Sequence, residues 1–154
     1  MTQILYGDRL GREGKIRVGC SAAIINEEGK VLLTRRLDNG QWCLPSGGME
    51  AGESPSETVI REVFEETGLH VRVTRLVGVY SDPNQLVVYV DGNKVQIVAV
   101  HFEAEVTGGT LGVSNETSAF GYFSLEEMGG MGMLGHHKKR IEDTLARKIE
   151  AVFE

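Results

Sequence analysis

The chain has 154 residues, 41% of them hydrophobic and 25% charged, which is typical of one ordinary globular domain with a single core. Its formal net charge of −6 argues against general binding to nucleic acid or to anionic membranes, because both need a basic surface. The N-terminus is polar, no apolar run reaches membrane-spanning length, and Cys20 and Cys43 lack the spacing of a metal or redox motif. We therefore expect a single cytoplasmic domain over residues 1–154, with no nucleic-acid partner and no membrane association.

The first part of the chain contains two strand-like runs. Residues 1–16 are mixed and polar, and they predict a poorly specified N-terminal arm. The segments Arg17 to Asn26 and Lys30 to Arg35 are rich in apolar residues, with the turn residues Glu27 to Gly29 between them. This pattern predicts a β-hairpin. A loop, a short apolar run from Trp42 to Leu44 and a glycine-containing loop follow.

A helix is predicted from Pro55 to Thr67. Ser54 and Glu57 have the spacing of a capping box, and proline is favoured at the first helical position. Gly68 follows the last residue of the apolar pattern and has the position of a C-cap.

The rest of the chain predicts mainly strands, at residues 71–80, 86–90, 95–106 and 119–123, with a hairpin turn at Asp91-Gly92. One helical turn at 125–128, a mobile glycine-rich segment at 129–135 and a terminal helix at 137–153 complete the prediction. Strands outnumber helices and are not each followed by a helix. This favours an α/β protein of the α+β type, with helices on the faces of a mixed sheet, over a doubly wound nucleotide fold.

The predicted helix at 55–67 has an apolar side and a charged side. The apolar side consists of Val59, Ile60, Val63 and Phe64, and the charged side of Glu57, Arg61, Glu62, Glu65 and Glu66. A solvated face with i,i+4 ion pairs is the plain interpretation. However, Glu62 and Glu66 are four residues apart with no cation between them, and like charges at that spacing cost stability. A hard divalent cation such as Mg²⁺ would relieve this repulsion, because it prefers oxygen ligands.

Residues 47–69 resemble the signature of the Nudix (MutT-like) hydrolases, G-x5-E-x7-R-E-U-x-E-E-x-G-U, in which U is a bulky aliphatic residue. Every defined position matches without a gap: Gly47, Glu53, Arg61, Glu62, Val63, Glu65, Glu66, Gly68 and Leu69. The order of strands on both sides is similar to the family fold, an α/β/α sandwich with a mixed sheet. The resemblance implies a hydrolase that needs Mg²⁺, for which Mn²⁺ can substitute.

The resemblance also implies roles for individual residues. The expected metal ligands are Gly47, through its backbone carbonyl, Glu53, Glu62, Glu65 and Glu66. Glu65 and Glu66 correspond to the principal ligands, and Arg61 corresponds to a residue that orients a glutamate. Hydrolysis also needs a carboxylate that takes the proton of the attacking water. Glu62 and Glu116 are both candidates, since family members often supply this base from a distant loop, and an ordinary loop carboxylate is an equally good interpretation of Glu116.

Residues outside the signature are candidates for binding the substrate. Trp42 and Tyr89 could stack on a nucleobase, although a packing role fits each of them as well. Arg35 or Arg36 could contact a phosphate, and a solvated strand end is the alternative. Pro83 lies near the place where a proline marks many members that hydrolyse ADP-ribose.

The expected function is hydrolysis of a diphosphate bond in a nucleoside diphosphate linked to another group, such as ADP-ribose or a sugar nucleotide. A nucleoside triphosphate pyrophosphohydrolase is the alternative within the same class. A catalytically silent nucleotide-sensing module is the alternative of another class, but such a protein is expected to lose ligand glutamates, and none is lost here. An isomerase of allylic diphosphates would need further active-site residues that the sequence does not identify. The sequence leaves the oligomeric state open, and a homodimer is one of the states it allows.

Overall fold

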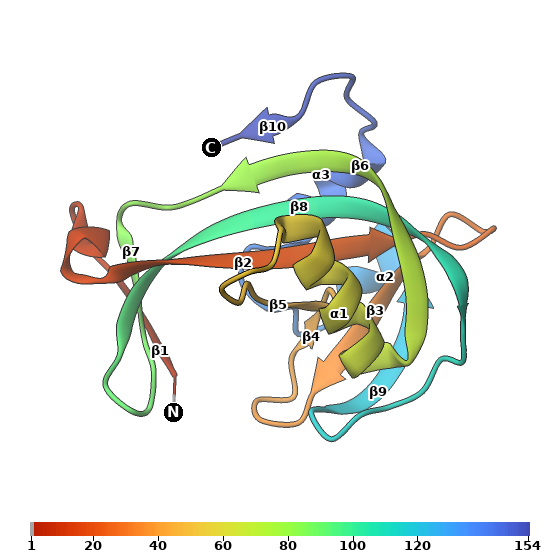
Figure 1. Cartoon of the computed structure of the whole chain (residues 1–154), viewed down its shortest axis with the longest axis horizontal. Coiled ribbons are helices and arrows are strands. Elements are labelled where there is room, and N and C mark those ends of the chain that lie inside the picture. The colour runs from red at the N-terminus through yellow and green to blue at the C-terminus, as the bar shows by residue number, and fades with distance from the viewer. Residues whose placement is uncertain (1) are drawn as a thin grey trace.

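The computed structural model describes residues 2–154 (Figure 1). The strands are β1 (Gln3–Tyr6), β2 (Lys15–Ile24), β3 (Val31–Arg36), β4 (Trp42–Cys43), β5 (Ser46–Gly48), β6 (Leu69–Tyr80), β7 (Gln85–Val88), β8 (Lys94–Gly109), β9 (Thr117–Phe123) and β10 (Val152–Phe153). The helices are the 3₁₀ turn η1 (Leu10–Glu13), α1 (Pro55–Thr67), α2 (Leu125–Met128) and α3 (His137–Leu145). None of the helices in residues 2–154 is both long enough and apolar enough to cross a membrane.

Two β-sheets form the centre of the molecule. The larger sheet has the strand order β1-β7-β8-β2-β5, and β6 pairs with β8 and carries β10 on its other side. Strands β2 and β8 run parallel, whereas β6 and β8 run antiparallel, so this sheet is mixed. The smaller sheet has the order β4-β3-β9. The predicted α+β class with a mixed sheet is confirmed.

Helices cover both faces of the larger sheet, with α1 in front of it and α3 behind it in Figure 1. Strand β2 shows how the alternation of side chains divides the core between these layers. Ile24 packs in a cluster with Val59 and Val63 of α1, whereas its neighbour Ala23 packs in a second cluster with Ile141 of α3. The arrangement is the α/β/α sandwich that the sequence predicts.

Helix α1 begins and ends as predicted. The Ser54 hydroxyl accepts a hydrogen bond from the Glu57 N–H (3.2 Å), and the Glu57 carboxylate accepts one from the Ser54 N–H (2.9 Å), which completes the capping box. Gly68 ends the helix with a φ of 79°, a left-handed conformation that favours glycine. Both ends of the carboxylate-bearing helix are therefore set by local interactions.

The apolar side of α1 is narrower than predicted. Val59 and Val63 are fully buried, but Ile60 and Phe64 are 37% and 47% exposed. Only one stripe of the helix meets the sheet, and Phe64 stacks on the exposed ring of His70 instead, with ring centroids 4.6 Å apart.

The predicted hairpin between the first two apolar runs is wrong. A single bridge between Ile25 and Val31 joins the ends of β2 and β3. Beyond it, β2 pairs with β5 and β8, while β3 pairs with β4 and β9. The turn between the two strands is where the chain passes from one sheet to the other.

Both chain ends also differ from the prediction. The N-terminal arm is regular, since β1 pairs antiparallel with β7 and η1 follows it. The terminal helix ends at Leu145 and does not continue to residue 153. Arg147 takes a left-handed φ of 49°, and the chain turns so that β10 pairs parallel with β6. The glycine-rich segment at 129–135, expected to be mobile, is held by backbone hydrogen bonds between Trp42 and both Gly132 and Leu134.

A buried histidine makes stability depend on pH. His101 is fully buried, with its ring nitrogens 2.8 Å from the Ser21 hydroxyl and 2.8 Å from the Thr144 hydroxyl. Burial lowers the pKa of His101 from 6.5 to about 3. As the pH falls below about 6.5, the unfolded chain therefore binds a proton that the folded chain does not, and this lowers the free energy of unfolding.

Urea unfolding of the wild type and His101→Gln at pH 7 and pH 5 measures this contribution. The wild type should lose about 2 kcal/mol more than the variant between these two pH values. Equal losses in the two proteins would show that His101 does not titrate in this way.

Candidate active site

Arg61 of α1 holds the acidic residues of the signature in place. Its Nε and Nη2 donate to the two carboxylate oxygens of Glu53, at 2.7 and 2.9 Å. Its Nη1 donates to Glu62 (2.8 Å) and to Glu65 (3.3 Å), and its Nη2 also donates to the Gly48 carbonyl (3.1 Å). One guanidinium group thus joins the loop before the helix, the helix itself and β5, which fits the orienting role expected for Arg61.

Glu53 is fixed by further contacts. The Thr58 hydroxyl (3.1 Å) and the Glu50 N–H (2.9 Å) both donate to its Oε1. Hydrogen bonds from Arg61 are the main cause that lowers the pKa of Glu53 to about 2. Glu53 is therefore ionised across the physiological pH range.

Glu62 and Glu66 lie against β5. The Ser46 N–H donates to the Glu66 carboxylate at 3.1 Å, and a Cβ atom at Gly47 would collide with the carboxylate of Glu62. Glycine at position 47 thus leaves room for the Glu62 carboxylate in the place where it lies. Burial raises the pKa of Glu62. Burial also raises the pKa of Glu66, to about 8, and the negative charges of Glu62 and Glu116 raise it further. These carboxylates lie in a site where a nearby cation would strongly stabilise their charged forms.

The available donors fit a hard divalent cation. All of them are carboxylate or backbone carbonyl oxygens, which Mg²⁺ and Mn²⁺ prefer, and no thiol lies among the signature residues. Within residues 2–154, no three His, Cys, Asp or Glu side chains have the geometry of a metal-binding group. Three of the expected ligands contact Arg61 instead, so binding a cation requires their side chains to turn toward Glu66 and the Gly47 carbonyl.

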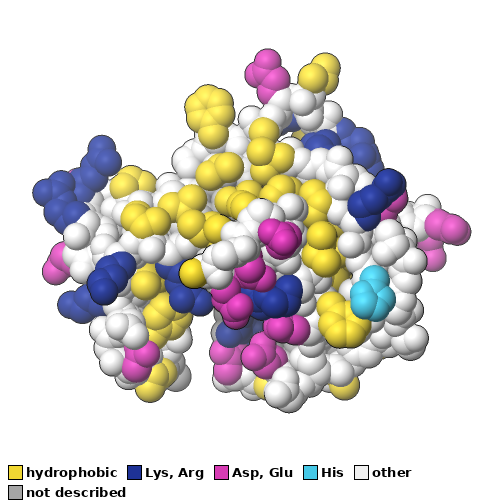
Figure 2. Space-filling view, viewed as in Figure 1, with side chains coloured by type: hydrophobic (Ala, Val, Ile, Leu, Met, Phe, Trp, Pro, Cys, Tyr) yellow, Lys and Arg dark blue, Asp and Glu magenta, His cyan; other side chains and the backbone are white. Residues whose placement is uncertain are grey.

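Acidic side chains gather on the face that carries α1, around a basic group and beside a deep notch in the surface (Figure 2). A hollow of about 450 Å³ adjoins Glu66. Its lining consists of Thr34, Arg36, Leu37, Asp38, Cys43, Glu66, Asn115, Glu116 and Thr117. The structure thus brings Glu116 from a distant loop into the same hollow as Glu66.

Of the two arginines at the end of β3, the hollow contains Arg36. Its Nε and Nη2 donate to Asp38, at 2.9 and 2.8 Å, and this pair lines the wall. Arg35 points elsewhere and donates to the Gly40 carbonyl at 2.9 Å. Strand alternation could have separated the two, since Arg36 shares a face with Leu32, which packs in the α1 cluster.

The other expected substrate contacts lie outside this hollow. Trp42 packs edge-on against Phe123, with ring centroids 5.0 Å apart, beside the α3 cluster. The backbone of Tyr89 closes the turn between β7 and β8 through bonds to Gly92 and Asn93. Pro83 accepts a hydrogen bond from the Gly11 N–H (2.9 Å), so it positions the N-terminal arm.

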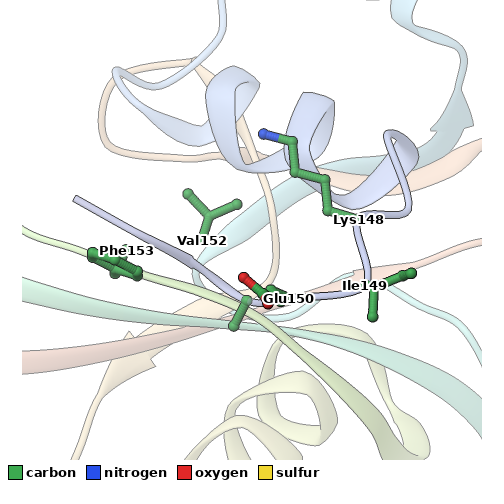
Figure 3. A pocket seen from close by; sticks show the side chains of 6 residues that line it. Lys148, Ile149, Glu150, Val152 and Phe153 are labelled. Carbon is green, nitrogen blue, oxygen red and sulfur yellow. The ribbon is translucent and has the colours of Figure 1, made fainter.

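A larger hollow, of about 600 Å³, lies away from the signature residues (Figure 3). Its walls come from one continuous stretch, residues 148–153, with Lys148 and Glu150 as the charged members. A hollow formed by six successive residues and containing one carboxylate has neither the donors nor the enclosure of a reaction site.

Comparison with known proteins identifies the family. The sequence profile described as the NUDIX domain matches residues 15–147, which include the whole signature, both sheets from β2 to β9 and the hollow. The chain belongs to the Nudix family.

Relatives and solved structures agree with this assignment. The chain is 36% identical over 111 residues to a MutT-like protein from Streptomyces ambofaciens, a match that covers 72% of this chain and 66% of that protein. It is 33% identical over 128 residues to an ADP-ribose pyrophosphatase from Methanocaldococcus jannaschii, covering 81% and 71% of the two chains. Its fold is similar to that of the MutT protein from Methanosarcina mazei, with a TM-score of 0.71, 28% identity and coverage of 88% and 99%.

The roles of the buried and exposed glutamates can be tested separately from folding. We expect Glu66→Gln and Glu65→Gln each to lower kcat at least roughly a hundredfold, because stabilising the developing charge with metal is worth several kcal/mol. Glu142→Gln, on the exposed side of α3, is a matched control that should keep its rate. A Glu66→Gln protein with native circular dichroism and near-native kcat would contradict the assignment.

Proposed function

We propose that the chain, acting as a single domain, is a Nudix hydrolase that cleaves a diphosphate linkage with Mg²⁺ as its cofactor, and that Mn²⁺ can substitute. The observation that carries the proposal is the full set of signature carboxylates: Arg61 orders Glu53, Glu62 and Glu65, and Glu66 is held against β5 beside the hollow. The expected ligands are those of the signature: Gly47, Glu53, Glu62, Glu65 and Glu66.

The chemistry follows from these charges. A diphosphate and a cluster of ionised glutamates repel each other, and a bound Mg²⁺ would neutralise the phosphate oxygens and activate water for attack. The attacking water forms a new P–O bond, the bridging P–O bond breaks, and the leaving phosphate keeps the bridging oxygen. Glu62 or Glu116 then holds the proton that the water loses.

For the substrate we propose a nucleoside diphosphate linked to another group, such as ADP-ribose or a sugar nucleotide. The 33% identity to a protein named ADP-ribose pyrophosphatase supports this choice. The hollow of about 450 Å³ is large enough to take one end of such a substrate, while the diphosphate lies at Glu62 and Glu66. A nucleoside triphosphate is the alternative substrate of the same site.

Two expectations from the sequence belong to this proposal. Cys20 and Cys43 are both free and buried, which supports a location in the reducing cytoplasm. The second concerns the oligomeric state, for which a homodimer is one of the states that the sequence allows, and the sedimentation coefficient of the purified protein tests it.

Activity should require a divalent metal and should select among substrates. We expect turnover to vanish after exhaustive EDTA treatment and to return with Mg²⁺ or Mn²⁺. On a panel of ADP-ribose, sugar nucleotides, dinucleoside polyphosphates and normal or oxidised triphosphates, a linked diphosphate should give the highest kcat/KM. Undiminished turnover in EDTA would contradict the metal requirement. If a triphosphate gives a kcat/KM well above that of every linked diphosphate, the triphosphate is the substrate and the proposed substrate class is wrong.

The two candidate bases can be distinguished by kinetics. If Glu116 is the base, Glu116→Gln should lower kcat by roughly two orders of magnitude while KM changes little. Glu126→Gln, an exposed carboxylate on α2, is the matched control. If Glu62→Gln loses far more kcat than Glu116→Gln does, the base lies on the helix instead.

A further inference from the structure

Arg17 lies against the signature loop on the face of β5 opposite to Glu62. A Cβ atom at Gly48 would collide with the guanidinium of Arg17, with Cζ only 2.9 Å and Nε 3.1 Å away. A Cβ atom at Gly47 would collide with the Glu62 carboxylate in the same way. Successive residues of a strand face opposite sides of its sheet. The Glu62 carboxylate therefore lies over Gly47 on one face of β5, and the Arg17 guanidinium lies over Gly48 on the other face.

The charge of Arg17 is not compensated by the protein. Its side chain is exposed, and no ion pair within residues 2–154 includes it. Arg61, on the other side of Gly48, is surrounded by three carboxylates. Arg17 is therefore the guanidinium next to the signature loop that is available to an anion. Guanidinium groups suit phosphate, because their N–H donors match two of its oxygens at once.

The edge of β5 connects the two faces. β5 is the last strand of its sheet, so its outer edge is not covered by another strand. One residue along a strand is only about 3.3 Å, a step similar to the separation of two linked phosphoryl groups. A diphosphate at this edge can thus approach the carboxylate face with one phosphate and Arg17 with the other. On the face that carries α1, basic side chains also lie beside the notch that adjoins the acidic cluster (Figure 2).

We propose that Arg17 is a substrate-binding residue, which contacts an oxygen of the phosphate that is farther from the signature glutamates. This inference rests on the proposed function and extends it, because it assigns the two phosphates of the substrate to opposite faces of β5. The signature does not include Arg17, which lies in β2, and the strands β3 and β4 separate β2 from the signature in the sequence.

The experiment compares Arg17→Met, Arg17→Lys and the wild type. Methionine keeps an unbranched side chain over Gly48 without the charge, and lysine keeps the charge without the paired donors. Arg12→Met is the control, because it removes the same charge from an exposed position on η1, which directly precedes β2. Binding of methylenediphosphonate in Mg²⁺ is measured by calorimetry, and KM and kcat are measured on the best substrate of the panel.

We expect Arg17→Met to weaken methylenediphosphonate binding and to raise KM by at least roughly tenfold, with kcat reduced less than threefold. Arg17→Lys should recover part of the loss, and Arg12→Met should bind within twofold of the wild type. If Arg17→Met binds and turns over like the wild type, Arg17 only fills space over Gly48 and the inference is overturned. If the wild type neither binds methylenediphosphonate nor cleaves any diphosphate, the proposed function fails, and the inference fails with it.

Discussion

The contacts of Arg61 are the constraint on which the site depends. Glu53, Glu62 and Glu65 would repel one another at the end of a short loop and along one helix face, and the guanidinium offsets that repulsion. The same group bonds to the Gly48 carbonyl, so it also fixes the distance between α1 and β5. Glu66 is the signature carboxylate that Arg61 does not reach. It is held by a backbone N–H of β5, and burial raises its pKa, which makes it the position where a metal cation would contribute most.

β5 is short, and its two glycines link the site to the sheet. Gly47 leaves space for the Glu62 carboxylate, and Gly48 leaves space for Arg17. Both glycines pair with β2, so the parallel β2 and β8 strands, which form the middle of the sheet, set the position of the signature loop. The fold thus places the carboxylates of one helix, the base candidate Glu116 and the cation of Arg17 around one open strand edge.

Local signals in the sequence predicted α1 and its caps, because a capping box and a helical repeat are decided within a few residues. The roles expected for the carboxylates came from the resemblance to the Nudix signature. The pairing of strands was not predictable in the same way. β2 and β3 look like a hairpin locally, yet their partners β8 and β9 come much later in the chain. β1 was missed for the same reason, since its pairing with β7 is non-local. Strand alternation puts Arg35 and Arg36 on opposite faces of β3, but the sequence alone does not show which of these faces meets α1.

If the α1 carboxylates form a divalent cation site, Mn²⁺ binding measures this most directly. The signal of free Mn²⁺ in electron paramagnetic resonance can be followed during titration of the wild type and of the Glu62→Gln, Glu66→Gln double variant. We expect the wild type to bind at least one Mn²⁺ and the folded variant to bind it at least roughly tenfold more weakly. Equal Mn²⁺ affinity in the two folded proteins would contradict it.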